Sequence, residues 1–225
     1  MMRVMASRKV LGWVCLVTYL VAAALVLAQE TKPPETKVWV LPKPATEGGK
    51  PLMEALKNRR TSREFSPKKL PDQVLSNLLW AACGVNRPDG RRTAPTAVNW
   101  QEIDVYVSTA DGLWLFDARE HALKPVLAED IRALTGRQAF VKDAPVNLIY
   151  VADFSRMGRA TDDDKRLYSA TDTGFISQNV YLFCASEGLA TVVRGLIEKP
   201  ALAKAMKLRP DQTIILAQTV GYPRQ

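Results

Sequence analysis

The sequence predicts an α+β fold with one hydrophobic core, because its helical and strand patterns do not alternate regularly. Three strand patterns follow one another between positions 103 and 126, and the first two flank Asp111-Gly112, a turn signal typical of a hairpin. One long helical pattern covers Asp162–Glu187, and from Phe175 onward it is apolar on nearly all sides, which indicates a buried central helix. We therefore expect a mixed or antiparallel sheet flanked by helices. The chain of 225 residues with 47% hydrophobic content suffices for such a core.

The first 28 residues have the organisation of a secretory signal. Three basic residues precede an uncharged apolar run over 10–28, which ends with the aliphatic Val26 and the small Ala28. Cleavage after Ala28 would lower the formal charge by three, from +8 to +5, and would place the domain in the periplasm or outside the cell. The alternative is an uncleaved membrane anchor, because the run is near the lower limit of length for a spanning helix.

Charge and residue usage disfavour several other classes of protein. A modest positive charge is ordinary for a solvated surface, and no basic stripe alternates with aromatic residues, which argues against nucleic-acid binding. His121 is the only histidine and lies in a polar turn, so we expect it at the surface and expect no histidine-based metal site or catalytic triad. Cys83 and Cys184 lie in apolar helical patterns and are expected as buried free thiols, although an exported pair can also form a disulfide.

The folded domain is expected over 51–225, after a linker or strap over 29–50 that is rich in proline and glycine. Within the linker, Val38–Leu41 is apolar and is expected to lie on the body of the domain. Pro51 opens a helix that runs to about Arg60. A second helix begins at Pro71-Asp72 and ends at Gly84, and a loop over 87–92 follows it.

The rest of the domain alternates irregularly between strands and helices. Val146–Ala152 is a continuous β-branched run and is expected as a central strand. Gly188 ends the long helix. Apolar periodicity predicts the other strands over Ile103–Ser108, Leu113–Asp117, Ala122–Val126 and Ile214–Val220, and the other helices over Glu129–Gly136 and Glu198–Lys207.

Three arginines and two hydroxyl side chains are concentrated at the end of the first helix, in Arg59-Arg60-Thr61-Ser62-Arg63-Glu64-Phe65. Guanidinium forks and hydroxyls are the usual ligands of a phosphate. An arginine cluster at a helix C-terminus can also compensate the helix dipole. Because Thr61 lies between the arginines and a second polar motif follows, we interpret the segment as a phosphate site. Its expected ligands are Arg59, Arg60, Thr61 and Arg63, joined by Arg224 from the C-terminal tail.

Small and amide side chains precede the first long strand, in Pro95-Thr96-Ala97-Val98-Asn99-Trp100-Gln101. A carboxamide carries a donor and an acceptor together, which suits the alternating edge of a heteroaromatic ring such as a flavin. Asn99 and Gln101 can alternatively cap turns before the strand. The ring-binding candidates by this chemistry are Asn99 and Gln101, and the family resemblance given in the next paragraph implies cofactor contacts from Pro95, Thr96 and Ala97 as well.

Taken together, four segments resemble landmarks of the nitroreductase family of FMN proteins and occur in the same order. Arg59–Phe65 is similar to the family's phosphate-binding Arg-Arg-Ser-x-Arg-x-Phe, with Thr61 in place of Ser. Pro95–Gln101 is similar to its Pro-Ser-Ala-x-Asn-x-Gln, with Thr96 in place of Ser. The other two are Asp172-Thr173-Gly174 followed by Gln178-Asn179, which resembles a core-helix motif, and Gly188-Leu189-Ala190 through Gly195, which resembles the segment over the isoalloxazine.

The resemblance implies a nitroreductase-like fold, FMN as cofactor and no metal. It also implies contacts from Gly188, Leu189 and Ala190 to the flavin, and a homodimer with each flavin at the subunit interface. An exported enzyme lacks ready access to NAD(P)H, so the electron donor is unknown, and a quinol or a redox partner is an alternative. Two functions stay open. One is an FMN-dependent oxidoreductase acting on a small organic molecule such as a nitroaromatic or a quinone, and the other is a non-catalytic exported protein that binds flavin or another ligand.

The run Leu78–Gly84 and the Asp-Gly hairpin further resemble the branch related to the azoline oxidases, which dehydrogenate thiazoline and oxazoline peptides. That branch is expected to use a Lys-Tyr pair about a dozen residues before the Asp-x-Gly motif, where this chain has Ala160-Thr161. The histidine that often follows the glycine is Phe175 here. Tyr168 is then the nearest candidate acid, although a packing role for its ring is the simpler interpretation. Azoline oxidation is therefore not expected.

Overall fold

The structure is a computed structural model that describes residues 37–224 of the chain. The expected signal sequence over 1–28 and the first part of the linker lie outside the described residues. No helix within 37–224 has the combination of length and apolar character needed to cross a bilayer.

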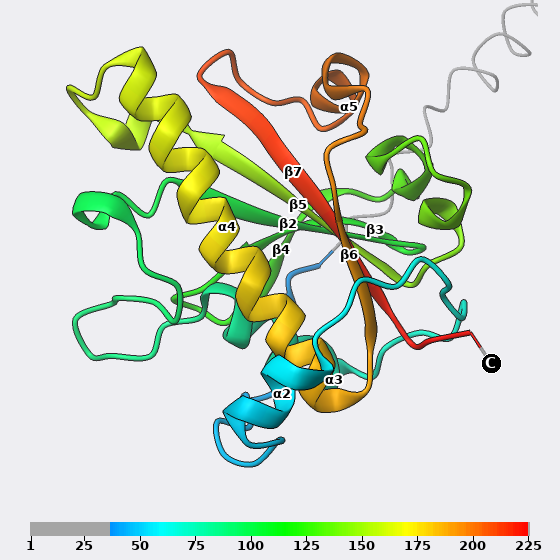
Figure 1. Cartoon of the computed structure of the whole chain (residues 1–225). Coiled ribbons are helices and arrows are strands. Elements are labelled where there is room, and N and C mark those ends of the chain that lie inside the picture. The colour runs from blue at the N-terminus through cyan, green and yellow to red at the C-terminus, as the bar shows by residue number, and fades with distance from the viewer. Residues whose placement is uncertain (1–36, 225) are drawn as a thin grey trace, which may run out of the picture. The chain divides into compact units, whose positions relative to one another are not determined.

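A seven-stranded antiparallel sheet forms the centre of the described domain (Figure 1). Its strand order is β1-β4-β3-β2-β5-β7-β6. Hence β1 and β6 are the edge strands, and β5 and β2 lie near the middle. The strands are β1 (Trp39–Val40), β2 (Ile103–Thr109), β3 (Gly112–Asp117), β4 (Ala122–Leu127), β5 (Val146–Asp153), β6 (Ala190–Arg194) and β7 (Gln212–Gly221).

The strand pairing follows from turn chemistry and from apolar content. Gly112 opens β3 with a φ of 141°, a conformation that L side chains rarely adopt, and so permits the tight β2–β3 connection expected at Asp111-Gly112. Every residue of β5 is buried, as expected for a central strand with both faces covered. The short strand β1 pairs with β4 and leads into Leu41, which is buried, so the segment Val38–Leu41 lies on the body of the domain as predicted.

Four α-helices of the described residues, 37–224, pack around this sheet. They are α2 (Leu52–Asn58), α3 (Asp72–Cys83), α4 (Asp162–Glu187) and α5 (Lys199–Ala205). The long helix α4 has the bounds that the sequence predicts, because both of its ends carry strong signals. Thr161 and Asp164 form a reciprocal capping box at its start, and Gly188 adopts the left-handed conformation, with a φ of 72°, at its end.

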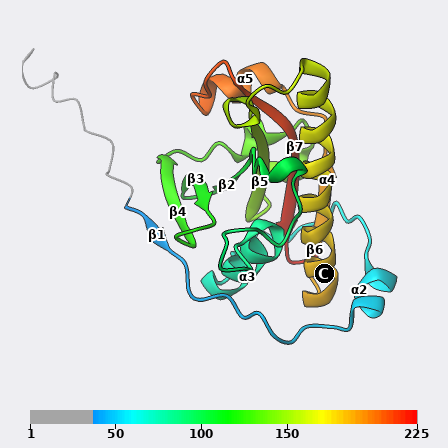
Figure 2. The same cartoon turned by 90° about the vertical axis from the view of Figure 1, so that its left-hand side faces the viewer.

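The two larger clusters of buried apolar side chains lie on opposite faces of the sheet, and a third, smaller cluster surrounds Phe65. The larger core joins α3 and α4 to alternate residues of β2 and β5, with Leu78, Val107 and Leu148 fully buried. The second core packs α5 against the opposite face, where Ile149 and Leu202 are fully buried. Figure 2 shows α4 extending along the sheet beside β5 and β7, with α3 next to it. The expected α+β class, an antiparallel sheet flanked by helices, is thereby confirmed.

Some local predictions were wrong. The helix expected over Glu129–Gly136 is a single 3₁₀ turn, Arg132–Thr135, and β6 was not predicted as a strand. The central helix α4 is buried on its sheet-facing side, whereas Phe175 on another side is 42% exposed. His121 is half-buried rather than a simple surface residue, because its ring lies 2.7 Å from the Ser76 hydroxyl and packs edge-on against Phe116.

Cys83 and Cys184 are both buried free thiols, as predicted. Burial raises the pKa of Cys83 to about 11 and raises that of Cys184 further. A buried thiol that stays protonated at neutral pH is a poor nucleophile. The two cysteines therefore contribute packing to the core rather than chemistry.

Candidate functional site

A cavity of about 450 Å³ opens between the end of α2, the C-terminal part of α4 and the start of β6. Four cationic side chains line it, Lys50, Lys57, Arg59 and Arg60, together with Ser62 and the segment Gly188–Thr191. Among the described residues that line this cavity there is no Asp or Glu. A concave site with clustered guanidinium and ammonium groups and no acid favours an anionic group such as a phosphate.

The arginine segment is fixed against α4 and β6 by Tyr181, a residue that sequence reasoning missed. The Tyr181 hydroxyl lies 3.0 Å from the Thr61 hydroxyl and accepts a hydrogen bond of 3.0 Å from the Val193 amide. The Arg59 guanidinium lies over the Tyr181 ring, 5.3 Å from its centroid. On the other side, the Ser62 amide donates to the Thr191 carbonyl at 3.0 Å. The backbone that presents Arg59 and Arg60 is therefore held at several points.

The expected phosphate ligands do not all line this cavity. Arg59 and Arg60 do, whereas Thr61 is tied to Tyr181 instead. Arg63 and Arg224 are exposed outside the lining, and the Arg224 amide donates to the Glu64 carbonyl at 3.3 Å. The cations that the sequence analysis omitted, Lys50 and Lys57, lie before the arginine motif, and only the fold brings them to the same opening.

The glycine segment after α4 lies in the same cavity as the arginines. Gly188, Leu189 and Ala190 all contribute to the lining, and the Leu189 amide closes the end of the helix on the Cys184 carbonyl at 2.8 Å. Ala190 then begins β6, paired with Gly221 of β7. Two of the three segments expected to bind cofactor therefore meet in one cavity.

The third segment, Pro95–Gln101, forms a strained loop before β2. Val98, Asn99 and Gln101 have positive φ values of 50°, 58° and 50°. Each such conformation costs of order 1–3 kcal/mol for a residue other than glycine, and it is most unusual for the β-branched Val98. Such strain persists only where the surroundings impose it, and it concentrates at functional sites. Asn99 is also an exposed residue of this loop, as a ring-binding role requires.

Hydrogen bonds from three directions impose this loop conformation. The backbone amide of Ala97 donates to Asp172 Oδ2 at 3.0 Å, and the backbone amide of Gln101 donates to the Thr96 hydroxyl at 3.1 Å. The Gln101 side chain donates to the Gly90 carbonyl and to Asn99 Oδ1, both at 3.1 Å. In this conformation the side-chain nitrogen of Gln101 is already engaged by Gly90 and Asn99. Gln101 therefore has the turn-capping role that the sequence analysis gave as an alternative.

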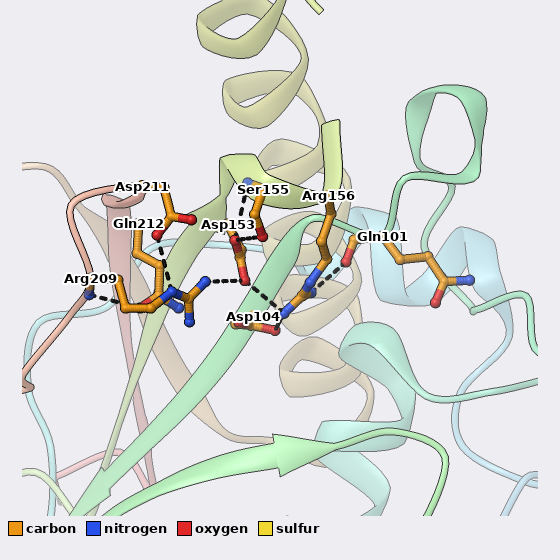
Figure 3. Close-up of polar contacts among 8 residues, drawn as sticks. All are labelled: Gln101, Asp104, Asp153, Ser155, Arg156, Arg209, Asp211 and Gln212. Atoms are coloured by element: carbon orange, nitrogen blue, oxygen red, sulfur yellow. Dashed lines mark hydrogen bonds and ion pairs between the residues drawn. The ribbon is translucent and has the colours of Figure 1, made fainter. Parts of the chain in front are cut away.

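Arg156 completes the anchoring from the end of β5 (Figure 3). It donates to the Gln101 carbonyl at 2.8 Å and to both oxygens of Asp104 at 2.7 and 2.8 Å. Arg209 extends the network by donating to Asp153 at 2.9 Å. Burial raises the pKa of Asp104, although Arg156 opposes the shift. For Asp153, burial acts in the same upward direction, but hydrogen bonds from Ser155 and Arg209 leave its pKa below the usual range.

The arginine cavity and the Pro95–Gln101 loop contact different parts of α4. The loop meets the helix at Asp172, whereas the cavity meets it at Tyr181, nine positions later. Nine positions correspond to about 13 Å along a helix. Asn99 and Gln101 instead line a separate open cavity of about 460 Å³ with Asp104 and Arg156. Within one chain the structure does not bring these two segments to a common cavity.

Tyr168 lies near the loop on α4, but in a packing role. Its ring meets the Trp100 ring edge-on, with 5.7 Å between centroids. This contact fixes Trp100 against the helix and so supports the loop from a further side. The contact agrees with the simpler interpretation that the sequence analysis gave for Tyr168.

Residues 56–222 match the nitroreductase family. The chain belongs to this family. It is 30% identical over 175 residues to a nitroreductase-like protein of Methanocaldococcus jannaschii, an alignment that covers 73% of this chain and 88% of that protein. These matches establish an oxidoreductase of a family whose members typically bind flavin.

Solved structures agree with this assignment. A nitroreductase-like protein of Ralstonia eutropha is 42% identical, with a TM-score of 0.81 over 84% of this chain and 91% of that chain. The microcin synthetase complex McbBCD of Escherichia coli contains a chain with a TM-score of 0.65 and 20% identity, covering 88% of this chain and 82% of that chain. At this identity the second likeness establishes the fold alone.

Proposed function

We propose that the protein is an exported FMN-dependent oxidoreductase that passes electrons to or from a small organic molecule, such as a nitroaromatic or a quinone. The observation that carries the proposal is the cavity lined by Lys50, Lys57, Arg59 and Arg60, with no carboxylate in its described lining. A terminal phosphate distinguishes FMN from riboflavin, and four cations at one opening suit that dianion. The volume of about 450 Å³ also lies within the range of cofactor sites, about 300–1,000 Å³.

The residues of this chain would divide the work of binding. Arg59 and Arg60 would hold the phosphate, and the Gly188–Ala190 backbone would lie along the rest of the cofactor. Asn99 is an exposed residue whose amide suits a ring edge. When bound, FMN supplies reversible hydride chemistry at its N5 atom, so the protein has to orient the substrate and exclude water rather than provide a nucleophile.

We further propose that a second copy of the chain completes the site. The Pro95–Gln101 loop and the arginine cavity lie at different parts of α4, and a two-fold interface would bring the loop of one copy to the cavity of the other. Exposed apolar side chains support such an interface. Met53 on α2 is 74% exposed, and Leu167 and Phe175 on α4 are 60% and 42% exposed. Helices α2 and α4 are in contact, so an interface across them would cover these exposed apolar side chains.

The substrate proposal rests on proton chemistry. At the positions where the azoline branch is expected to have its Lys-Tyr pair, this chain has Ala160 and the helix-capping Thr161. Tyr168 packs against Trp100. Electron transfer to a nitroaromatic or quinone acceptor needs no strong base on the protein, whereas removal of a proton from an azoline ring does. The proposal is therefore a reductase for electron-poor acceptors.

The proposal is tested on the full chain as the cell exports it. Mass spectrometry of the purified protein identifies the ligand that copurifies, and FMN is the expected result. The flavin-loaded protein is then reduced with dithionite and mixed with quinone, nitroaromatic and thiazoline-peptide substrates in parallel. We expect rapid reoxidation by the first two classes only. Flavin binding without turnover would instead favour the exported ligand-binding alternative, and the absence of any flavin binding would refute the cofactor assignment.

A further inference from the structure

Two carboxyl side chains lie buried together beneath the Pro95–Gln101 loop. Glu102 directly precedes β2 and is 0% exposed, and Asp172 on α4 is 2% exposed. Both line the same small internal space of about 10 Å³, which is too small for more than about one water molecule. Burial of an ionised carboxyl group costs free energy unless the group is paired or neutralised. The placement of Glu102 and Asp172 beside the same internal space therefore requires an explanation.

Each carboxyl group accepts a hydrogen bond from the N-terminal end of the strained loop. Glu102 Oε2 accepts from the Thr96 hydroxyl at 3.0 Å, and this hydroxyl in turn accepts from the Gln101 amide. Asp172 Oδ2 accepts from the Ala97 amide at 3.0 Å. The two carboxyl groups thus fix the start of the loop directly, and the Thr96 hydroxyl links Glu102 to the other end of the loop at Gln101.

The second oxygen of Glu102 has no hydrogen-bond donor among the described residues. Two ionised carboxylates can only accept, so neither can satisfy the other, and their charges repel. A single proton between them provides the missing donor and removes the repulsion. Burial, together with the neighbouring Asp172 charge, raises the pKa of Glu102, which agrees with a retained proton.

No described cation forms an ion pair with either carboxyl group in place of that proton. Within residues 37–224, no salt bridge joins Glu102 or Asp172 to a cation, and the nearby cation Arg156 is engaged by Asp104 and Asp153. Arg92 from the loop before Pro95 lines the same internal space, but its Nε atom has no partner there. Cys83 on α3 also lines it, and burial raises the pKa of that thiol to about 11, so it stays neutral.

We propose that Glu102 and Asp172 share one proton, and that this proton holds the Pro95–Gln101 loop in the conformation that presents Asn99. Both are positioning residues, because they act through Thr96 and Ala97 rather than on a substrate. Loss of the proton leaves two adjacent buried charges, which separate and release the hydrogen bonds that impose the positive φ values. The structural part of this inference is independent of any ligand, and its consequence for flavin rests on the proposed function.

The direction of the pH dependence follows from the raised pKa. The native state keeps a proton that the unfolded chain releases near pH 4.3, the ordinary value for Glu. The stability that this pair contributes is therefore fully present below the pKa of the unfolded chain. It is lost as the pH rises from there through the raised pKa of the folded state. The loop, and with it flavin affinity, should weaken in the same direction, by at most about tenfold per pH unit for one proton.

The test compares wild type with Glu102→Gln, whose amide can donate to Asp172 as the protonated acid does. The control is Glu120→Gln, which removes an exposed carboxyl group elsewhere. Without added flavin, we expect the wild-type and control melting temperatures to fall as the pH rises from about 5 to 8, and that of Glu102→Gln to fall less. The infrared band of a protonated carboxyl group should be present in wild type at neutral pH and absent from Glu102→Gln. Asp172→Asn should flatten the profile in the same way and provides a second test if Glu102→Gln fails to fold.

An identical pH profile in wild type and Glu102→Gln, or no protonated carboxyl band in wild type at neutral pH, would overturn the inference. A separate experiment with flavin measures FMN affinity at each pH for both proteins and compares them as the ratio of variant to wild type. The FMN phosphate titrates in both measurements alike, so its effect cancels in this ratio. A ratio that does not change with pH would refute the coupling to the loop while leaving FMN binding intact. If no FMN binds to either protein while the stability and infrared results hold, the proposed function alone fails.

Discussion

Replacement of Arg59 by alanine gives the sharpest test of the arginine cavity. Arg59 lines the cavity and lies over the Tyr181 ring, so its guanidinium is already positioned before any ligand binds. A charge-assisted hydrogen bond contributes about 1.5–3 kcal/mol, which corresponds to roughly ten- to a hundredfold in affinity. We therefore expect Arg59→Ala to weaken FMN binding by that factor, as measured by fluorescence titration of the flavin.

Two comparisons separate a phosphate contact from a general effect. Riboflavin lacks the phosphate, so its affinity should be the same for Arg59→Ala and wild type. Arg137→Ala removes an equal charge from an exposed arginine outside the cavity, and its FMN affinity should match wild type. If Arg59→Ala left FMN affinity unchanged, or weakened FMN and riboflavin equally, the assignment of the cavity to a phosphate would be wrong.

Three further predictions follow from other parts of the molecule. Tyr181→Phe leaves the Val193 amide without its acceptor, and it should lower the free energy of unfolding by about 1–3 kcal/mol in urea titrations, whereas a change near zero would show that water replaces the hydroxyl. Phe175→Asp places a charge in the proposed interface, so sedimentation should detect dissociation of a dimer, and a monomeric wild type would refute the interface. The exported protein should begin at Gln29 on N-terminal sequencing, and Met1 on soluble cytoplasmic protein would contradict the signal sequence.

The elements that the sequence predicts well are those with strong local signals. The bounds of α4 follow from Thr161 and Gly188, and the β2–β3 hairpin follows from Gly112. The prediction omits β6 because its five residues follow the helix without a turn cluster, and only pairing with β7 makes the segment a strand. The apolar pattern of α4 cannot show which side faces the sheet, so the exposure of Phe175 required the fold.

The candidate site was predicted only in part, because local sequence patterns show some of its residues and tertiary structure brings in the others. Arg59 and Arg60 are visible as a local cluster, but Lys50 and Tyr181 reach the cavity only through tertiary structure. The positive φ values of Val98 and Gln101 contradict their local preferences and arise from hydrogen bonds to distant segments. The contact between Glu102 and Asp172 joins residues seventy positions apart, and no local pattern indicates it.

The Ser62–Thr191 hydrogen bond has a consequence for solubility. Strand β6 is the last strand of the sheet, and an uncovered edge is a template for pairing with another chain. The Ser62 amide occupies the Thr191 carbonyl on β6, and Phe65 forms a bridge to Pro223 just beyond β7. The segment that presents Arg59 and Arg60 therefore also covers part of this sheet edge. Mutations that loosen this segment would promote intermolecular strand addition, so resistance to aggregation and an intact anion cavity depend on the same few residues.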